Sequence, residues 1–259
     1  MSAPADRVEL SILLPVRNDG INLRIMLKIL RSVMAAAHEV IVVHDAPDDD
    51  SIGVVQAMQA GYPELRIVHN QLGRGVVNAI RAGVAVARGE YVLIFAADEV
   101  GPVLAIEDML ALMHGGCEFV SCTRYAHGGR RLGGSLVGGA LSRLANKLFH
   151  ALVGSPFTDA TTGIKMFRRD CFDRLNLQSR PIGWAVAFEM AIKAQHAGLK
   201  LGEVPIVSID RLYGGESSFR LGPWVNEYSR WFAWGWRHRR APGGHAPASC
   251  VVRVPTNWR

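Results

Sequence analysis

The sequence predicts an α/β fold in which a mostly parallel central sheet is flanked by helices, in a Rossmann-like arrangement. Strand-like and helix-like segments alternate through the first half of the chain, and this alternation produces right-handed crossovers between parallel strands. The strand-like segments are short unbroken apolar runs such as Tyr91–Ala97, which are typical of strands buried on both faces. The 259-residue chain is 49% hydrophobic and 20% charged, which indicates a packed globular domain.

Each expected element is bounded by a turn signal. Helices are indicated by apolar residues at helical spacing, as in Leu23, Met26, Leu27 and Leu30, with Asp19 or Asn22 able to cap that helix. The expected strands are Glu9–Pro15, Glu39–Val43, Leu65–His69, Tyr91–Ala97, Phe119–Thr123, Ile164–Phe167 and Glu203–Ile209. The other expected helices are Ser51–Ala60, Val76–Arg88, one beginning near Val103, Leu141–Val153, Asp170–Leu175 and Ala185–Ala197, with a Gly-rich loop at Gly128–Gly139.

The C-terminal part differs in composition from the rest. We expect a domain over residues 1–221, an amphipathic aromatic helix over 222–240 and a disordered tail over 241–259. On a helical projection one face collects the aromatic residues Trp224, Tyr228, Trp231, Phe232 and Trp236. Such a face beside a basic end suits an interfacial helix on anionic lipid, and the alternative is that it docks on the protein's own core.

The charge balance favours anionic partners. The net charge is +6 and the pI is about 9.4, which fits phosphorylated metabolites or an acidic membrane surface. No motif indicates nucleic-acid binding. The cysteines show no metal-ligand spacing, the N-terminal residues lack a signal-peptide pattern, and no apolar run approaches the roughly 20 residues that span a bilayer. We therefore expect a cytoplasmic protein, with peripheral contact at the inner face of the membrane left open.

Acidic turns follow three of the expected strands. They carry Asp19, Asp45 and Asp98. Because the carboxyl ends of parallel strands lie at one edge of a sheet, these carboxylates are expected to converge on one crevice, where α/β sheets bind ligands. Asp98 is then placed to hold a divalent cation bound to a phosphorylated ligand. The alternative is that each acid only caps the helix that follows it, as Asp98 would for a helix near Val103.

An ordered set of short motifs resembles family 2 glycosyltransferases of the GT-A fold, which binds nucleotide-diphospho-sugars, and most of all their dolichol-phosphate mannosyltransferase branch. Each motif is weak alone, but the set runs in order from about Leu10 to Leu221. The matched segments are Pro15–Asp19 (P-x-x-N-E), Val42–Asp49 (V-V-D-D-G-S-x-D), Asn70–Gly75 (N-x-G-x-G), Ala96–Asp98 (D-x-D), Thr123–Gly129 (S-R-Y-x-x-G-G), Asp159–Lys165 (D-x-T-S-G-F-R), Glu189 (F-x-x-E-M), Glu203–Ile206 (E-V-P-I) and Asp210–Ser217 (D-R-x-x-G-x-S).

The resemblance implies an inverting transfer of a sugar from GDP-mannose or a UDP-sugar to a polyprenyl phosphate or related membrane-borne acceptor, with Mg²⁺ or Mn²⁺. The implied donor-binding residues are Pro15, Arg17, Asn18, Asp19, Asp45, Asn70, Gly73, Arg74, Gly75, Asn78, Ala97 and the metal ligand Asp98. The implied acceptor- and phosphate-binding residues are Arg124, Arg131, Ser142, Lys165, Arg211 and Ser217. The implied catalytic residues are Asp98, Asp159, Glu189 and Arg211, of which Asp159 and Glu189 shape the sugar pocket.

Two departures from the family pattern leave alternatives open. Ala96 and His44 stand where the family has acids, which is compatible with a catalytically silent, nucleotide-binding scaffold. A glycosyltransferase acting on a saccharide hydroxyl is a further alternative, with Glu189 or Asp159 as its general base. A dehydrogenase is disfavoured because the third glycine of the dinucleotide motif is missing. Structural roles are also open: Glu189 as an exposed helix acid, and Arg124 and Arg211 as ion-pair partners of Asp159 and Asp210.

Overall fold

The computed structural model describes residues 8–133, 136–209, 221–239 and 249–255. The strands are β1 (Leu10–Pro15), β2 (His38–His44), β3 (Leu65–His69), β4 (Tyr91–Ile94), β5 (Phe119–Thr123), β6 (Arg130–Leu132), β7 (Lys165–Arg168), β8 (Leu201–Pro205), β9 (Val207–Ile209) and β10 (Cys250–Val252). The α-helices are α1 (Gly20–Val33), α2 (Ser51–Gln59), α3 (Val76–Val86), α4 (Ile106–His114), α5 (Leu136–Val153), α6 (Ala185–His196) and α7 (Leu221–His238). Short 3-10 turns cover η1 (Gly101–Ala105), η2 (Arg169–Cys171) and η3 (Asp173–Leu175).

Within the described residues, the central sheet has eight strands in the order β10-β8-β5-β7-β4-β1-β2-β3. All neighbouring pairs are parallel except those of β7, which runs antiparallel to β4 and β5. A small second sheet pairs β6 with β9 in parallel. The expectation of a mostly parallel sheet flanked by helices is therefore confirmed.

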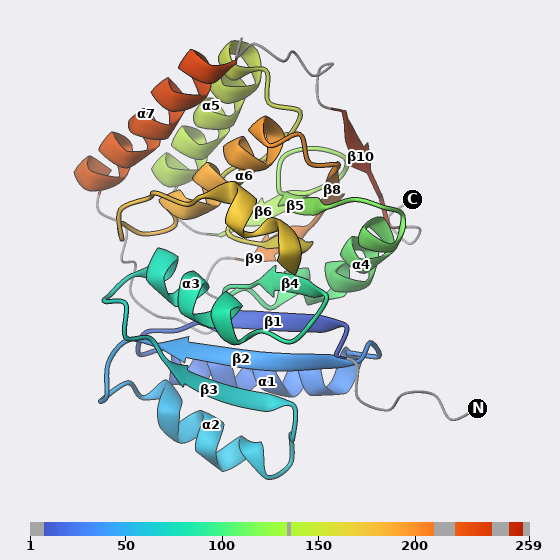
Figure 1. Ribbon diagram of the computed structural model, residues 1–259, viewed down its shortest axis with the longest axis vertical. Helices are drawn as coiled ribbons and strands as arrows, with labels where there is room; N and C mark the ends of the chain where they lie inside the picture. The colour runs from blue at the N-terminus through green and yellow to red at the C-terminus, as the bar shows by residue number, and fades with distance from the viewer. Residues whose placement is uncertain (1–7, 134–135, 210–220, 240–248, 256–259) are drawn as a thin grey trace.

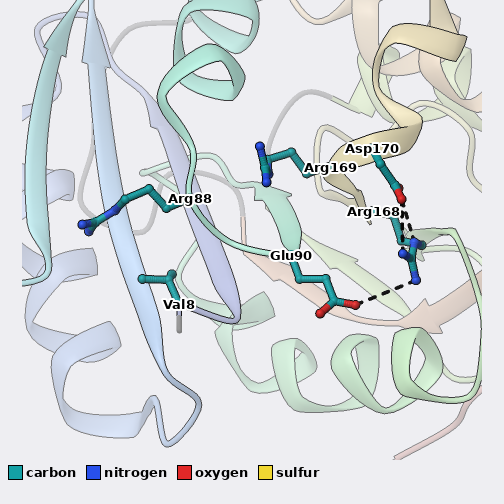
Figure 2. Close-up of a pocket in the computed structure, with 6 residues that line it drawn as sticks. All are labelled: Val8, Arg88, Glu90, Arg168, Arg169 and Asp170. Carbon is teal, nitrogen blue, oxygen red and sulfur yellow. Dashed lines mark hydrogen bonds and ion pairs between the residues drawn. The ribbon is translucent and has the colours of Figure 1, made fainter. Parts of the chain in front are cut away.

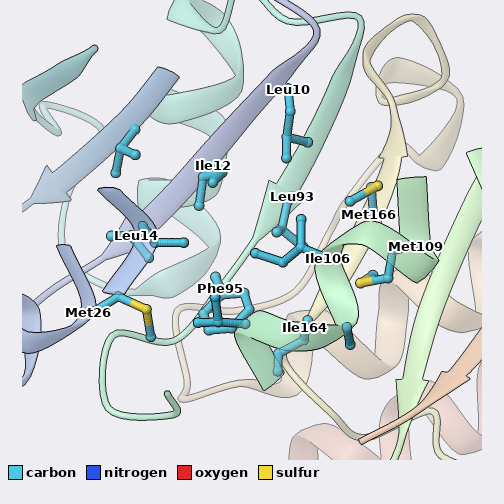
Figure 3. Close-up of a cluster of buried hydrophobic side chains, with 14 of the residues drawn as sticks. Leu10, Ile12, Leu14, Met26, Leu93, Phe95, Ile106, Met109, Ile164 and Met166 are labelled. Carbon is cyan, nitrogen blue, oxygen red and sulfur yellow. The ribbon is translucent and has the colours of Figure 1, made fainter. Parts of the chain in front are cut away.

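Helices cover both faces of the sheet and create two apolar cores (Figure 1). On one face, α1, α2 and α4 form one apolar core with alternate residues of the sheet strands. Figure 3 shows this core, which includes Leu10, Ile12 and Leu14 of β1, Met26 of α1 and Met109 of α4. The remaining helices α3, α5, α6 and α7 cover the other face. Because side chains alternate along a strand, each central strand contributes to both cores, and this explains its unbroken apolar sequence.

Several expected boundaries are wrong in informative ways. The strand expected at Tyr91–Ala97 ends at Ile94, where its hydrogen-bonded partner strand β7 begins. The Gly-rich loop expected over Gly128–Gly139 instead holds β6 and the start of α5. Asp19 occupies the N-cap position of α1, but its side chain makes no capping hydrogen bond and accepts one from Asn22 instead, at 2.6 Å.

The C-terminal region also departs from the expectation. The tail expected to be disordered contributes β10, whose Cys250, Val251 and Val252 extend the sheet beside β8. Part of the aromatic face of α7 packs inward, with Trp231 only 1% exposed and Phe232 against Phe149 of α5, whereas Trp236 is 47% exposed. The alternative of docking on the protein's own core therefore holds for Trp231 and Phe232. None of the helices in the described residues is long and apolar enough to cross a membrane.

Candidate active site

The carboxyl ends of β1, β2 and β4 lie at one edge of the sheet because these strands are parallel neighbours. Asp19, Asp45 and Asp98 follow these three strand ends. The chain therefore brings acids from separate parts of the sequence to the same edge, as the alternation of strands and helices predicts.

Asp45 is the most informative of these acids. Its Oδ2 accepts a hydrogen bond from the backbone N–H of Gly75, at 3.1 Å, which ties the end of β2 to the start of α3. Its Oδ1 is buried and has no hydrogen-bond partner among the described residues. A buried carboxylate oxygen without a partner is costly, so this atom is suited to accept an N–H from a ligand.

Polar contacts within the turn before α3 fix its shape. Asn70 donates to the carbonyl oxygen of Gly73 at 2.7 Å, and Asn78 donates to the carbonyls of Gly73 and Arg74, both at 3.2 Å. Gly73 and Gly75 have backbone φ angles of 94° and 110°, which residues other than glycine rarely adopt. The expected donor-binding residues of this segment thus form one rigid turn at the N-terminus of a helix, where backbone N–H groups attract anions.

The loop after β2 is fastened to the loop after β1 by acids whose roles the sequence did not reveal. Asp49 accepts from the backbone N–H of Asn18 at 3.0 Å, and Asp50 accepts from that of Gly20 at 3.0 Å. Asn18 adopts a left-handed conformation with a φ of 50°. Arg17 in the same loop is exposed, and Pro15 ends β1. The acidic run in this loop therefore fixes the geometry around Asp19.

Asp98 lies in the turn after β4, next to Ala97, which is buried, and to Ala96. Glu99, a conceivable substitute for the missing acid, accepts a hydrogen bond from Ser208 at 3.2 Å. The described residues contain no group of three or more His, Cys, Asp or Glu that could hold a metal ion by themselves. Any divalent cation here would therefore take most of its ligands from a bound diphosphate and from water, as Mg²⁺ commonly does.

A buried ion pair links β5 to the turn before β7. Arg124 donates from Nε to Oδ2 of Asp159 at 2.7 Å and from Nη2 to Oδ1 at 3.1 Å, a bidentate geometry. Asp159 is fully buried and the Arg124 side chain is 12% exposed. Burial works against the charged carboxylate, but Arg124 and then Lys165 hold the pKa of Asp159 below its ordinary value. The structural alternative considered for Arg124, an ion pair with Asp159, is therefore present.

Hydroxyl and amide groups complete this cluster from α5. Asn146 donates to Asp159 at 3.1 Å and accepts from the N–H of Ala160 at 2.9 Å. Ser142 exchanges a hydrogen bond with Thr161 at 2.8 Å and accepts one from the hydroxyl of Tyr125 at 2.9 Å. The inner face of α5 therefore helps to hold the Arg124–Asp159 pair, and Ser142, which we expected to bind the acceptor, contacts this cluster through Thr161.

Lys165 and Glu203 lie beneath the pair, inside the sheet. Lys165 is fully buried and donates from Nζ to Ser121 at 2.7 Å, so its position corrects the expectation that it contacts phosphates. Burial lowers the pKa of Lys165 to about 8. Burial likewise raises the pKa of Glu203 to about 7, although Thr158 and backbone N–H groups donate to it. In the sequence, an acid within an otherwise apolar strand is the feature that could have singled out Glu203.

Glu189 is fully buried on α6, which rules out the exposed helix acid. It accepts from the backbone N–H groups of Gln178 and Ser179, the latter at 2.7 Å, and pairs with Lys193 at 2.7 Å. Lys193 also donates to the carbonyl of Asn176. Both carboxylate oxygens of Glu189 are therefore engaged, and in this structure it braces the segment before α6 instead of facing a sugar.

The remaining expected residues divide into two groups. Arg131 lies on β6 beside α5, where a Cβ on Gly139 would come within 3.1 Å of its Nη1. Arg211 and Ser217, together with Asp210, fall outside the described residues. Their predicted roles stay predictions.

One cavity of about 190 Å³ lies at the opposite edge of the sheet and is shown in Figure 2. Its arginines are engaged within the protein: Arg88 pairs with Glu39, Arg168 with Asp170, and Arg169 donates to the carbonyl of Gly89. This pocket is separated from the carboxyl edge by the length of β4, so we do not place the active site there.

The chain resembles known glycosyltransferases in both sequence and structure. Residues 11–175 match the family described as Glycosyl transferase family 2. A glycosyltransferase AglD from Haloferax volcanii is 28% identical over 79% of this chain, which spans only 34% of that protein's length. A dolichol-phosphate mannosyltransferase from Mycosarcoma maydis is 26% identical over 75% of this chain and 68% of its own length.

Solved structures support the fold. Glucosyl-3-phosphoglycerate synthase from Mycobacterium tuberculosis, in complex with Mn²⁺, UDP and glucosyl-3-phosphoglycerate, superposes with a TM-score of 0.65 at 17% identity, covering 92% of this chain and 82% of that one. The same enzyme in complex with phosphoglyceric acid gives 0.67 at 18% identity, covering 89% and 80%. The likenesses to solved structures show the GT-A fold, and the family match over residues 11–175 shows that the protein belongs to glycosyl transferase family 2.

Proposed function

We propose that this glycosyltransferase moves a sugar, with inversion, from a nucleoside-diphosphate sugar such as GDP-mannose or a UDP-sugar to a polyprenyl phosphate or a related membrane-borne acceptor. The donor lies at the carboxyl edge of β1, β2 and β4, and the acceptor phosphate approaches from the side of Arg124 and Arg131. The similarity to a dolichol-phosphate mannosyltransferase over 75% of the chain supports this choice of acceptor class.

The unpartnered Oδ1 of Asp45 supports the donor assignment. Uracil and guanine each present a ring N–H that a carboxylate oxygen can accept, and a base seated there would supply the missing hydrogen bond. The Gly73–Gly75 turn beside it leads into the N-terminus of α3, and a helix N-terminus favours bound anions such as a diphosphate. Asp19 and the segment from Pro15 to Asn18 then border the nucleoside from β1.

The residues at the turn after β4 fit a divalent cation that is shared with the diphosphate. Asp98 would hold Mg²⁺ or Mn²⁺, and the bound cation would neutralise charge on the departing nucleoside diphosphate. Ala96 removes one protein ligand, so we expect weak binding of the cation without nucleotide. Among this chain's own groups, Arg124, Arg131 and Arg211 are the cations proposed to balance phosphate charge.

The main support for a phosphate acceptor is the burial of both candidate general bases. Asp159 is fully buried against Arg124, and Glu189 is fully buried against Lys193 and two backbone N–H groups. A sugar hydroxyl needs a base to remove its proton, whereas a phosphate acceptor is already an anion at neutral pH. This arrangement favours the phosphate over the saccharide hydroxyl.

The test compares polyprenyl phosphate with the matching polyprenol, which differs only in the acceptor group. Purified protein is incubated with each lipid, a panel of UDP- and GDP-sugars and Mg²⁺ or Mn²⁺, and release of nucleoside diphosphate is measured together with the lipid-linked sugar. We expect transfer to the phosphate and none to the polyprenol or to free saccharides. Transfer to a hydroxyl acceptor would overturn the acceptor assignment, and no release with any pair would favour the catalytically silent scaffold.

A further inference from the structure

A row of leucines lies exposed along the outer face of α5. Leu141, Leu144, Leu148 and Leu152 are spaced for one narrow helical stripe and are 39%, 53%, 42% and 43% exposed. We call these four residues the leucine stripe. The inner face of the same helix is covered, because Phe149 and Val153 belong to the core. An apolar stripe of this length without a cover among the described residues indicates an interaction surface.

The stripe continues onto the end of α7. The two helices lie side by side at one end of the molecule (Figure 1), joined by the contact of Phe149 with Phe232. Arg239, just after α7, donates to the carbonyl oxygen of Leu152 at 3.0 Å and lies over the ring of Trp236. Trp236 is 47% exposed, unlike the aromatic residues that α7 turns inward. A half-exposed tryptophan beside an arginine therefore borders the C-terminal end of the stripe.

The exposed charged residues that the structure describes on α5 and at the end of α7 are all positive. Arg143 and Lys147 are exposed on α5, and Arg237 and Arg239 are exposed at the end of α7. From Leu136 to Val153, α5 contains no Asp or Glu. The acid of α7, Glu227, is buried and paired with Arg230. Leucines flanked by cations suit an anionic lipid surface, which accepts the leucines in its boundary and attracts the cations.

A second copy of this chain is a poorer occupant. Two stripes face to face would bring Arg143 and Lys147 of both copies together, and α5 supplies no carboxylate to pair with them. We propose that the leucine stripe, with Trp236 and the flanking cations, seats the protein on an anionic membrane surface.

This surface has a consequence that rests on the proposed function. The inner face of α5 carries Ser142 and Asn146, which hold the Arg124–Asp159 pair. The stripe is therefore separated from that cluster by about one helix diameter, on the order of 10 Å. A lipid-borne phosphate at the membrane surface would be presented near Arg124.

The test is sedimentation of the full chain with vesicles of phosphatidylcholine alone or mixed equally with phosphatidylglycerol. We expect binding to the mixed vesicles that weakens with added salt, and a drop of at least roughly tenfold in the variant L144E/L148E. The matched control is V33E/L104E, which changes two exposed apolar residues on other elements and should bind like the wild type. Melting temperatures of both variants report whether the fold is intact.

Two results would overturn the proposal: wild-type protein that ignores the mixed vesicles, or L144E/L148E that binds as tightly as the control. If the wild-type protein does not bind vesicles but forms a dimer in light scattering, and L144E/L148E is a monomer, the leucine stripe is a self-association surface instead. The vesicles contain neither donor nor acceptor, so the outcome is independent of the transfer reaction. If the wild-type protein binds the mixed vesicles but transfers no sugar to polyprenyl phosphate, only the proposed function is contradicted.

Discussion

Replacing Asp159 with Asn should strongly destabilise the protein. The substitution keeps the size of the side chain but removes the buried anion that Arg124 and Lys165 share. Lys165 is fully buried and Arg124 is nearly so, so neither cation can recover water at little cost. Removing one partner of a buried pair typically costs about 3–5 kcal/mol, and D159N should lose roughly that amount of unfolding free energy.

The exposed pair Arg168–Asp170 provides the control. Its side chains are 40% and 67% exposed, and pairs of this kind contribute only about 0–1 kcal/mol. D170N makes the same chemical change at the surface. In urea unfolding at pH 7, the D159N midpoint should fall well below that of the wild type while D170N stays close to it. The melting temperature of D159N should fall by roughly 10 °C, at about 2–4 °C per kcal/mol. If D159N is as stable as D170N, the buried pair does not hold this region together.

Three further changes test the burial of Glu203, the glycine turn before α3 and the packing of α7. Burial raises the pKa of Glu203 to about 7 in the folded protein, against 4.5 for an exposed glutamate. Because the folded protein binds this proton more tightly than the unfolded chain, Glu203 makes the protein less stable as the pH rises from about 4.5 to about 7. E203Q should remove this pH dependence from urea unfolding midpoints measured across that range. In G75A the added Cβ would lie 2.5 Å from Cβ of Pro181, at a residue whose φ is 110°. This variant should lose about 1–3 kcal/mol of unfolding free energy, measured by urea unfolding. The control G53A has open space around its Cβ in α2 and should be as stable as the wild type or more stable. W231A should cost about 3–5 kcal/mol in the same assay because that ring is buried against the core, and W236A less than about 1 kcal/mol; equal effects would contradict the inward packing of α7.

The regular part of the fold was predictable because local signals and tertiary structure agree there. The alternation of apolar runs with amphipathic helices gave Leu65–His69 and Phe119–Thr123 with their observed bounds. The reversed direction of β7 could not be predicted, since a short apolar strand carries no mark of whether its neighbours run parallel to it. The strand Cys250–Val252 was missed because its pairing with β8 is non-local and its flanking sequence is rich in Pro and Gly.

The position of the candidate site at the carboxyl edge of the sheet was predictable from the sequence, whereas its side-chain contacts were not. Strand order places Asp19, Asp45 and Asp98 at one edge, which follows from topology alone. Which side chains are buried depends on three-dimensional packing, so the engagement of Glu189 with Lys193 and of Lys165 with Ser121 was out of reach. A resemblance transfers a residue's position along the chain, whereas its contacts depend on neighbours from distant segments.

A calorimetric titration of UDP and GDP, each with Mn²⁺, into three proteins tests most directly whether the donor binds beside Asp45. These are the wild type, D45N at the carboxyl edge of the sheet, and R168Q at the pocket of the opposite edge. We expect the wild type to bind one of the two nucleotides, R168Q to bind it with the same affinity, and D45N to bind it roughly tenfold or more weakly. A hydrogen bond to a charged group contributes about 1.5–3 kcal/mol. Full affinity in D45N, or a loss confined to R168Q, would contradict the placement of the donor beside Asp45.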